Sequence, residues 1–332
     1  MKTILHHQTL SISLVVLSSI LIIISLFIGP ASIAPTAAIA ALFNDHGAIS
    51  VVVREIRLPR ALAAWVAGAC LGAAGAGLQG LLRNPLADPG VLGVSAAAAL
   101  GAVLSIYFNF ATLAFWVTPF SAILFALGAT TILYVLGAGR VSTARLILIG
   151  VGISSLCGAL LSLVMNLSPN PYALSDLINW LFGTVANRSF QDIALTVPFT
   201  VVGFAAIYAS GPGLSALTLG EETAATIGAN LARTTMLVIA GAAALVGASV
   251  AIAGAIGFIG IVAPHIVRAF SGHNPAHVLV PSALLGGAIL TAADLMIRVL
   301  PFDQELKLGV AAALIGAPGF VWVAMSSKRI TS

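Results

Sequence analysis

The stretch RALAAWVAGACLGAAGAGLQGLL, residues 60–82, decides the class of fold. It holds a single charged residue, Arg60, in 23 positions. A helix that crosses a bilayer needs about 20 consecutive, mostly apolar residues. The run stops at Arg83-Asn84-Pro85, where proline cannot continue a regular helix because it lacks the backbone donor and clashes with the preceding turn. The stretch therefore predicts a transmembrane helix.

Small residues recur every fourth position in this run and in a second run further along the chain. The two sets are Gly68, Gly72, Ala76 and Gly80, and Gly150, Ser154 and Gly158. Small faces of this kind let two helix backbones approach closely within lipid, where the hydrophobic effect does not drive helices together. We interpret both sets as helix-packing faces and not as binding sites.

The composition extends this interpretation to the whole chain. Of its 332 residues, 60% are hydrophobic and only 7% are charged, whereas a soluble domain carries roughly 25% charged residues. The net charge is +4, but the 14 Lys and Arg residues are scattered singly, which argues against a nucleic-acid surface. The two cysteines, Cys70 and Cys157, lie in apolar runs and are expected to be packing residues. Residues 1–332 are thus predicted to form one all-α, polytopic membrane bundle.

Apolar runs and their polar or Gly/Pro interruptions predict about ten transmembrane helices. Their approximate ranges are 11–29, 60–82, 91–108, 112–137, 143–167, 190–210, 232–252, 254–270, 278–299 and 306–325. Residues 30–58 are expected to form a polar connection, and 172–183 a helix too short to span, lying at the membrane interface. The first run is interpreted as a span because it is too long for the apolar part of a signal peptide.

Lysine and arginine give a weak indication of orientation. With both termini in the cytoplasm, eight of these residues fall inside and six outside. The six outside residues are Arg54, Arg57, Arg60, Arg188, Arg298 and Lys307. An excess of two does not settle the topology, and the outside arginines need an explanation of their own.

The most polar connection is GPGLSALTLGEETAATIGANLAR, residues 211–233. Thr218 and Glu221 have the spacing of a capping box, which predicts a short helix over 219–228 that Gly228 ends. Glu221 and Glu222 would lie at the positive end of this helix. The spacing alone is equally compatible with a solvated connecting helix and with a docking helix for a cytoplasmic partner.

Several long motifs identify a resemblance to a known family. They are IRLPR (56–60), QGLLRNPLADPGVLGVS (79–95), INWLFG (178–183), LGEETAATIG (219–228), AGAIGFIGIVAPHIVR (253–268) and ALIGAPGFVW (313–322). In this order, and over nearly the whole chain, the sequence resembles the iron-siderophore/vitamin B12/haem permease family of ABC importers. Two departures are visible: Ala263 stands where the family often has valine or isoleucine, and ELKLG (305–309) replaces the usual ELPVG.

The resemblance implies a fold, a location and a set of partners. Such permeases have ten transmembrane helices per subunit and work as pairs in the bacterial inner membrane, so a homodimer is expected. They act with two cytoplasmic ATPase subunits and a periplasmic substrate-binding protein. ATP and magnesium would bind the ATPase, and no cofactor is expected on this chain. In agreement, none of the lysines Lys2, Lys307 and Lys328 lies in a phosphate-binding glycine loop.

The resemblance also implies roles for particular residues. Coupling to the ATPase would fall to the loop at about 211–231, through Leu219, Gly220, Glu221, Glu222, Ala225 and Gly228. A cytoplasmic gate would involve Asn84, Leu86, Ser142 and Thr143. The binding protein would dock through Arg57, Arg60 and Arg298, which are expected to be unpaired. Asp294 is either a buried ion or, more simply, an i,i+4 partner of Arg298, and His265 is expected to be a packing or capping residue.

The expected function is transport of an iron chelate, either a ferric siderophore or haem, driven by ATP hydrolysis on separate subunits. Import of cobalamin is the alternative within the same family. An ion-coupled secondary transporter would require a buried acidic residue without partners, and only Asp294 comes near this description. An intramembrane enzyme is disfavoured because the predicted spans contain no recognisable catalytic motif.

Overall fold

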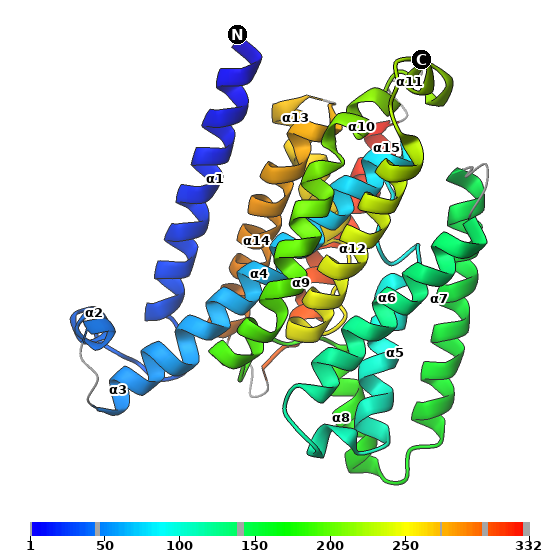
Figure 1. Ribbon diagram of the computed structural model, residues 1–332. Helices are drawn as coiled ribbons and strands as arrows, with labels where there is room; N and C mark the ends of the chain where they lie inside the picture. The colour runs from blue at the N-terminus through cyan, green and yellow to red at the C-terminus, as the bar shows by residue number, and fades with distance from the viewer. Residues whose placement is uncertain (1, 44–46, 138–142, 273, 301–304, 328–332) are drawn as a thin grey trace.

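A computed structural model of the chain describes residues 2–43, 47–137, 143–272, 274–300 and 305–327, and within these ranges it contains helices and no strand (Figure 1). The helices are α1 (Lys2–Phe27), α2 (Pro35–Phe43), α3 (Ala48–Val51), η1 (Val52–Arg57), α4 (Leu58–Leu82), α5 (Val94–Tyr107), η2 (Phe110–Thr112), α6 (Val117–Gly137), α7 (Thr143–Asn166), α8 (Pro171–Leu181), α9 (Phe190–Ala209), α10 (Gly211–Leu217), α11 (Glu221–Thr226), α12 (Leu231–Ala253), α13 (Ile259–Ser271), α14 (Pro275–Val299) and α15 (Leu308–Ser327). The all-α expectation is confirmed.

Seven helical stretches in the described ranges are long and apolar enough to cross a membrane. They are Gln8–Phe27, Ala48–Leu82, Val117–Leu136, Ala144–Asn166, Phe190–Ala209, Leu231–Ala253 and Pro275–Val299. Three further apolar helical segments are shorter: Val94–Tyr107, Ile259–Ser271 and Leu308–Pro318, of which the last is the first part of α15. The expected number of about ten spans is therefore not confirmed, because α5, with 14 residues, and α13, with 13, rise only about 20 Å, against a hydrocarbon core of about 30 Å.

The segment 30–58 differs from the expected polar connection. It contains α2, and the second span is a continuous helix from Ala48, twelve residues before the expected start at Arg60. Within it, η1 is a π-helical turn in which the Leu58 N–H donates to the carbonyl of Val53. Pro59 follows directly, and its ring would clash with the carbonyl one regular turn earlier. We relate the wider turn to this proline, which allows the helix to pass through a position where the sequence predicted a break.

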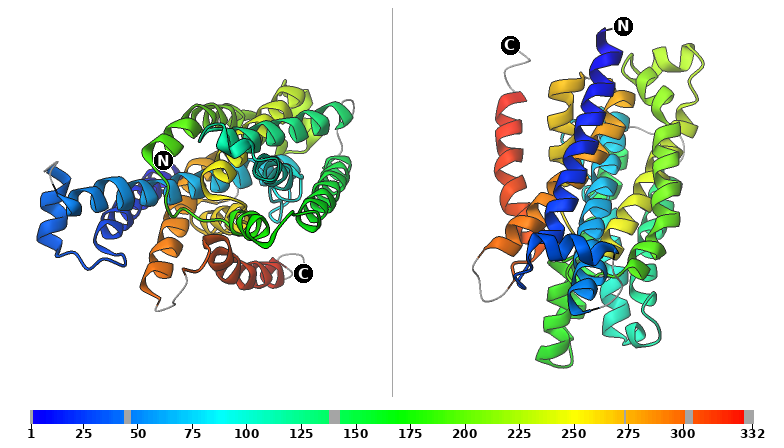
Figure 2. Two further views of the ribbon diagram at one scale, coloured as in Figure 1. Left: turned by 90° about the horizontal axis from the view of Figure 1, so that it is seen from below. Right: turned by 90° about the vertical axis from the view of Figure 1, so that its left-hand side faces the viewer.

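Three helices form the centre of the bundle. In the most apolar 18-residue stretch of each helix, 83% of the residues are buried in α4, 83% in α12 and 72% in α14. The corresponding fraction is only 11% in α7, 17% in α9 and 22% in α1. Figure 2 shows the same arrangement from two further directions, with α1, α7 and α15 at the periphery. The least buried helices are thus available to lipid or to other chains.

The small-residue face of α4 is a close helix contact, as expected. A Cβ atom built on Gly68 would lie 2.2 Å from the carbonyl oxygen of Gly286 in α14, and one on Gly72 would lie 2.1 Å from that of Ser282. A third contact was not predicted: a Cβ on Gly75 would lie 1.9 Å from the carbonyl oxygen of Gly260 in α13. Only glycine allows backbones to meet at these distances.

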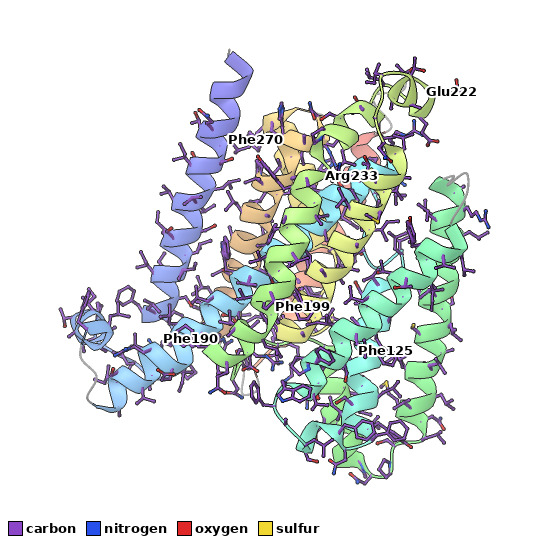
Figure 3. All side chains as sticks on the ribbon, viewed as in Figure 1. Phe125, Phe190, Phe199, Glu222, Arg233 and Phe270 are labelled. Atoms are coloured by element: carbon purple, nitrogen blue, oxygen red, sulfur yellow. The ribbon has the colours of Figure 1, made fainter. Side chains whose placement is uncertain are left out.

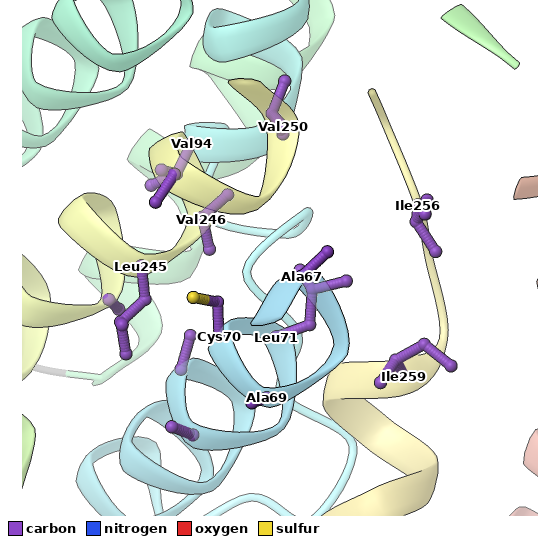
Figure 4. Packing of buried hydrophobic residues seen from close by; sticks show 14 of the residues in the cluster. Ala67, Ala69, Cys70, Leu71, Val94, Leu245, Val246, Val250, Ile256 and Ile259 are labelled. Carbon is purple, nitrogen blue, oxygen red and sulfur yellow. The ribbon is translucent and has the colours of Figure 1, made fainter. Parts of the chain in front are cut away.

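A different face of α4 packs against α12 through side chains. Figure 4 shows Ala67, Cys70 and Leu71 of α4 near Leu245 and Val246 of α12, within the main hydrophobic cluster. Cys70 and Cys157 are both buried and both free, which agrees with their interpretation as packing residues. The core thus surrounds α4 on several sides and fixes the helix ends that carry the candidate site residues.

Candidate functional site

The expected functional residues lie at two opposite ends of the bundle (Figure 1). The α11 end contains α10, α11, the start of α1 and the start of α12. The α2 end contains α2, the end of α1, the start of the long helix Ala48–Leu82 and the end of α14. Figure 3 shows Glu222 and Arg233 at the α11 end and Phe190 toward the opposite end. The coupling residues and the expected docking arginines are therefore far apart.

At the α2 end, Arg57 is buried and serves as a cap for α1. Its Nη1 donates to the carbonyl of Leu26 at 2.8 Å, and its Nη2 donates to the carbonyl of Ala31 at 2.5 Å. The last carbonyls of a helix have no intrahelical donors, and a cation stabilises the negative end of the helix dipole. Arg57 thus fixes the end of α1 against the start of the second span.

Arg60, Asp294, Arg298 and Glu305 form an ion network beside this cap. Arg60 donates from Nε to Asp294 Oδ1 at 3.0 Å and from Nη2 to the same oxygen at 2.8 Å, and its Nη2 also contacts Glu305. Arg298 pairs with Asp294 one turn away and donates from Nη1 to the carbonyl of Ser25 at 3.2 Å. The predicted Asp294–Arg298 pair is confirmed.

The expectation that the three arginines are unpaired is wrong. Arg57 is bound to backbone carbonyls, and Arg60 and Arg298 share the carboxylate of Asp294. The i,i+4 spacing had predicted the pair of Arg298 with Asp294, whereas nothing in the sequence indicated that Arg60 also binds Asp294, because these two residues are 234 positions apart. The side chain of Arg60 retains 12% exposure, whereas that of Arg298 retains 2%. Among the three, Arg60 is the residue that reaches the surface.

At the α11 end, the expected helix is shorter than predicted. It covers Glu221–Thr226 and not 219–228, because Gly220 (φ 95°) and Gly228 (φ 85°) adopt left-handed conformations on either side of it. The predicted role of Gly228 in ending the helix is confirmed. Leu219, Glu222 and Ala225 are exposed on or beside it.

The predicted capping box is wrong. Thr218 donates its hydroxyl to the carbonyl of Ser215 at 2.7 Å, and the N-cap position of α11 is Gly220, which has no side chain to cap with. Glu221 instead accepts from Arg83 Nη2 at 2.8 Å, between side chains that are 47% and 44% exposed. A real capping box, Ser189 with Asp192, begins α9, and the same sequence signal could have found it.

The turn after α4 carries part of the expected gate. Leu86 N–H donates to the Asn84 side-chain oxygen at 2.9 Å, which gives an Asx-type turn. Thr143 is the first residue of α7, and Ser142 lies outside the described residues. The gating roles of Asn84, Leu86, Ser142 and Thr143 stay predictions.

A buried amide, which the sequence analysis missed, connects this turn to α13. Gln79 Nε2 donates to the carbonyls of Ala87 at 3.2 Å and Gly260 at 3.0 Å, and its Oε1 accepts from Arg268. A polar group buried in a span is costly unless its hydrogen bonds are made, and here both amide atoms are bonded. Gln79 is the lone amide in the run 60–82, which is the signal that could have identified it.

The loop between α4 and α5 also lines an open cavity of about 460 Å³. Its walls include Asp88, Ser154 and Ser155 of α7, and Phe258 before α13. Burial raises the pKa of the Asp88 carboxyl, while a hydrogen bond from the Gly90 N–H opposes this shift. The cavity thus places one carboxyl group and two hydroxyls between α7 and the start of α13.

Comparison with known proteins places this architecture in a family. The FecCD transport family matches residues 16–326. The chain is 34% identical to the Fe(3+)-citrate import system permease protein YfmE of Bacillus subtilis, over 96% of this chain and 94% of that protein. It is 36% identical to the vitamin B12 import system permease protein BtuC of Citrobacter koseri, with the same coverage.

A solved structure agrees with these matches. It is described as an inward-facing conformation of a metal-chelate type ABC transporter, and it matches with a TM-score of 0.86 and 30% identity over 96% of this chain and 99% of that one. The chain therefore belongs to the FecCD transport family of ABC transporter permeases, which are transport subunits and not themselves enzymes.

Proposed function

We propose that this permease forms the membrane pathway for an iron chelate, a ferric siderophore or haem, in an importer driven by separate ATPase subunits. The observation that carries the proposal is the family match over residues 16–326, together with a relative named for ferric citrate import and a structural neighbour named for metal chelates. Cobalamin is the second candidate substrate, because relatives named for vitamin B12 import are equally similar.

The full transporter would contain two copies of this chain, two cytoplasmic ATPase subunits and a periplasmic binding protein. Each copy would cross the bacterial inner membrane about ten times, with α5, α13 and α15 completing the seven longer spans. The α11 end would face the cytoplasm together with both termini. The exposed α7 supports the presence of a second copy: Leu148 is 74% and Leu156 is 62% exposed in the single chain.

Coupling and docking would use the opposite ends of the chain. Residues 219–228, with Leu219, Gly220, Glu221, Glu222, Ala225 and Gly228, would enter the ATPase surface. Their support is a short helix that projects from the bundle and is exposed on most of its surface (Figure 3). The binding protein would dock at the α2 end, mainly on Arg60, with Arg57 and Arg298 holding the surface in place. The gate would lie at Asn84, Leu86, Ser142 and Thr143, and the cavity beside Asp88 would belong to the pathway.

The test is uptake by the complete transporter in cells that lack other routes. Labelled ferric citrate, a hydroxamate siderophore, haem and cobalamin are supplied in parallel, with an ATPase subunit inactivated in its nucleotide site as the control. We expect ATP-dependent uptake of at least one iron chelate. Uptake of cobalamin alone would replace the proposed substrate with the second candidate, and uptake that persists with the inactive ATPase would contradict the mechanism.

A further inference from the structure

Two carboxylates of different character contact the guanidinium of Arg60. Asp294 lies inside the protein, with 2% of its side chain exposed, and it accepts from both Nε and Nη2 of Arg60. Glu305 lies at the surface, with 43% of its side chain exposed, and contacts Nη2 alone. Asp294 therefore orients the arginine, whereas Glu305 covers the part of the arginine that faces outward.

The charges of this network balance while Glu305 is in place. Arg60 and Arg298 carry two positive charges, against two negative charges on Asp294 and Glu305. Without Glu305 the network would carry one positive charge in excess, beside the further cation Arg57. Glu305 thus lowers the positive potential at the surface that a negatively charged partner would meet.

The two carboxylates also differ in how readily they can be replaced. An ion pair with an exposed partner contributes little to stability, because water and salt ions compete for both charges. Removing a buried carboxylate leaves the positive charges of its arginines buried without a counter-charge, which destabilises the folded protein strongly. An incoming carboxylate could therefore displace Glu305 while Asp294 keeps the planar guanidinium in a fixed orientation, ready for a paired contact.

We propose that Glu305 is an internal substitute for a carboxylate of the binding protein, and that an aspartate or glutamate of that protein takes its place on Arg60 during docking. The inference rests on the proposed function, because the partner is the binding protein. Among Arg57, Arg60 and Arg298, only Arg60 offers exposed surface, so one exchange per permease subunit is expected. Asp294 is the positioning residue, and Glu305 sets how strongly Arg60 attracts the partner.

The experiment measures docking of the substrate-loaded binding protein to the purified complete transporter, at low and high ionic strength. The variant is Glu305→Gln. Its matched control is Glu55→Gln, which removes the same charge from an exposed glutamate of η1 near Arg57. We expect Glu305→Gln to tighten docking about two- to five-fold at low ionic strength, as expected for release of an exposed ion pair, with little gain at high ionic strength. Glu55→Gln should have a smaller effect, and Glu305→Asp should behave like the unmodified chain.

Arg60→Gln separates failure of this inference from failure of the docking role. If Arg60→Gln weakens docking while Glu305→Gln leaves it unchanged or weaker, Glu305 is no substitute, and the docking role of Arg60 stands. If Arg60→Gln docks like the unmodified chain, both ideas are wrong. Recovery of the ATPase subunits with each variant reports folding. If Glu305→Gln loses these subunits, Glu305→Ser takes its place in the same assay, and if Arg60→Gln loses them, Arg60→Lys takes its place.

Discussion

The two ends of this permease use ion pairs in opposite ways. At the α2 end, Asp294 is buried between Arg60 and Arg298, and the carbonyl of Ser25 in α1 accepts a further hydrogen bond from Arg298. At the α11 end, Arg83 and Glu221 form a single pair between side chains that are nearly half exposed. Buried ion networks fix the relative position of the elements that they join, whereas exposed pairs contribute little and exchange readily. The comparison indicates that the α2 end is a rigid surface and that α11 is held loosely.

The largest expected effect is at the loosely held end. Deletion of residues 219–228 should leave the protein inserted in the membrane but abolish recovery of the ATPase in a detergent pull-down, because the projecting helix is removed and the core is not. Docking of the binding protein at the α2 end, measured on the same preparation, is the internal control. Recovery of the ATPase at the unmodified yield would show that α11 is a connecting helix only.

A smaller effect is expected at the rigid end. Asp294→Asn should destabilise the protein by about 3–5 kcal/mol, because two arginines would lose a buried carboxylate. Thermal unfolding of the detergent-purified chain measures the effect. Asp176→Asn, at an exposed position in α8, is the matched control and should change stability by less than about 0.5 kcal/mol. Equal stability of the two variants would contradict the inference that the buried ion network holds the α2 end rigid.

The smallest effect should follow loss of the exposed pair. Arg83→Ala should change stability by no more than about 1 kcal/mol, and less at high ionic strength. The same unfolding measurement, repeated at two salt concentrations, gives the result. A loss comparable to that of Asp294→Asn would mean that the α11 end is also built on a fixed ionic contact.

The sequence was sufficient for those features that depend on neighbouring residues. Apolar runs predicted the all-helical bundle, and the spacing of Gly68 and Gly72 predicted a close helix contact that the structure contains. Asp294 and Arg298 lie one helical turn apart, and their ion pair was also predicted. In each case the information lies within a few positions of the chain, so periodicity alone can reveal it.

Features that depend on tertiary contact were missed or wrong. Glu221 was assigned to a capping box, but it pairs with Arg83, 138 residues away. The bonds of Gln79 to the carbonyls of Ala87 and Gly260 require a turn and a helix start that come together only in the folded chain. Helix lengths were overestimated at α5 and α13, since hydropathy marks apolar composition but not where the backbone turns.

The contacts of α4 at Gly68, Gly72 and Gly75 have a consequence for how the permease could open to one side of the membrane and then to the other. At these points carbonyl oxygens of α14 and α13 lie where a Cβ atom would be, so no side chain separates the helices that could change its rotamer to accommodate a movement. Sliding α4 along either neighbour would soon drive one backbone into another, because the space exists only opposite glycine. Packed interfaces of this kind hold discrete arrangements and do not deform smoothly. Helices α4, α13 and α14 should therefore move together as one rigid unit. The conformational changes that open one side of the membrane pathway and close the other must then occur in the helices around this unit.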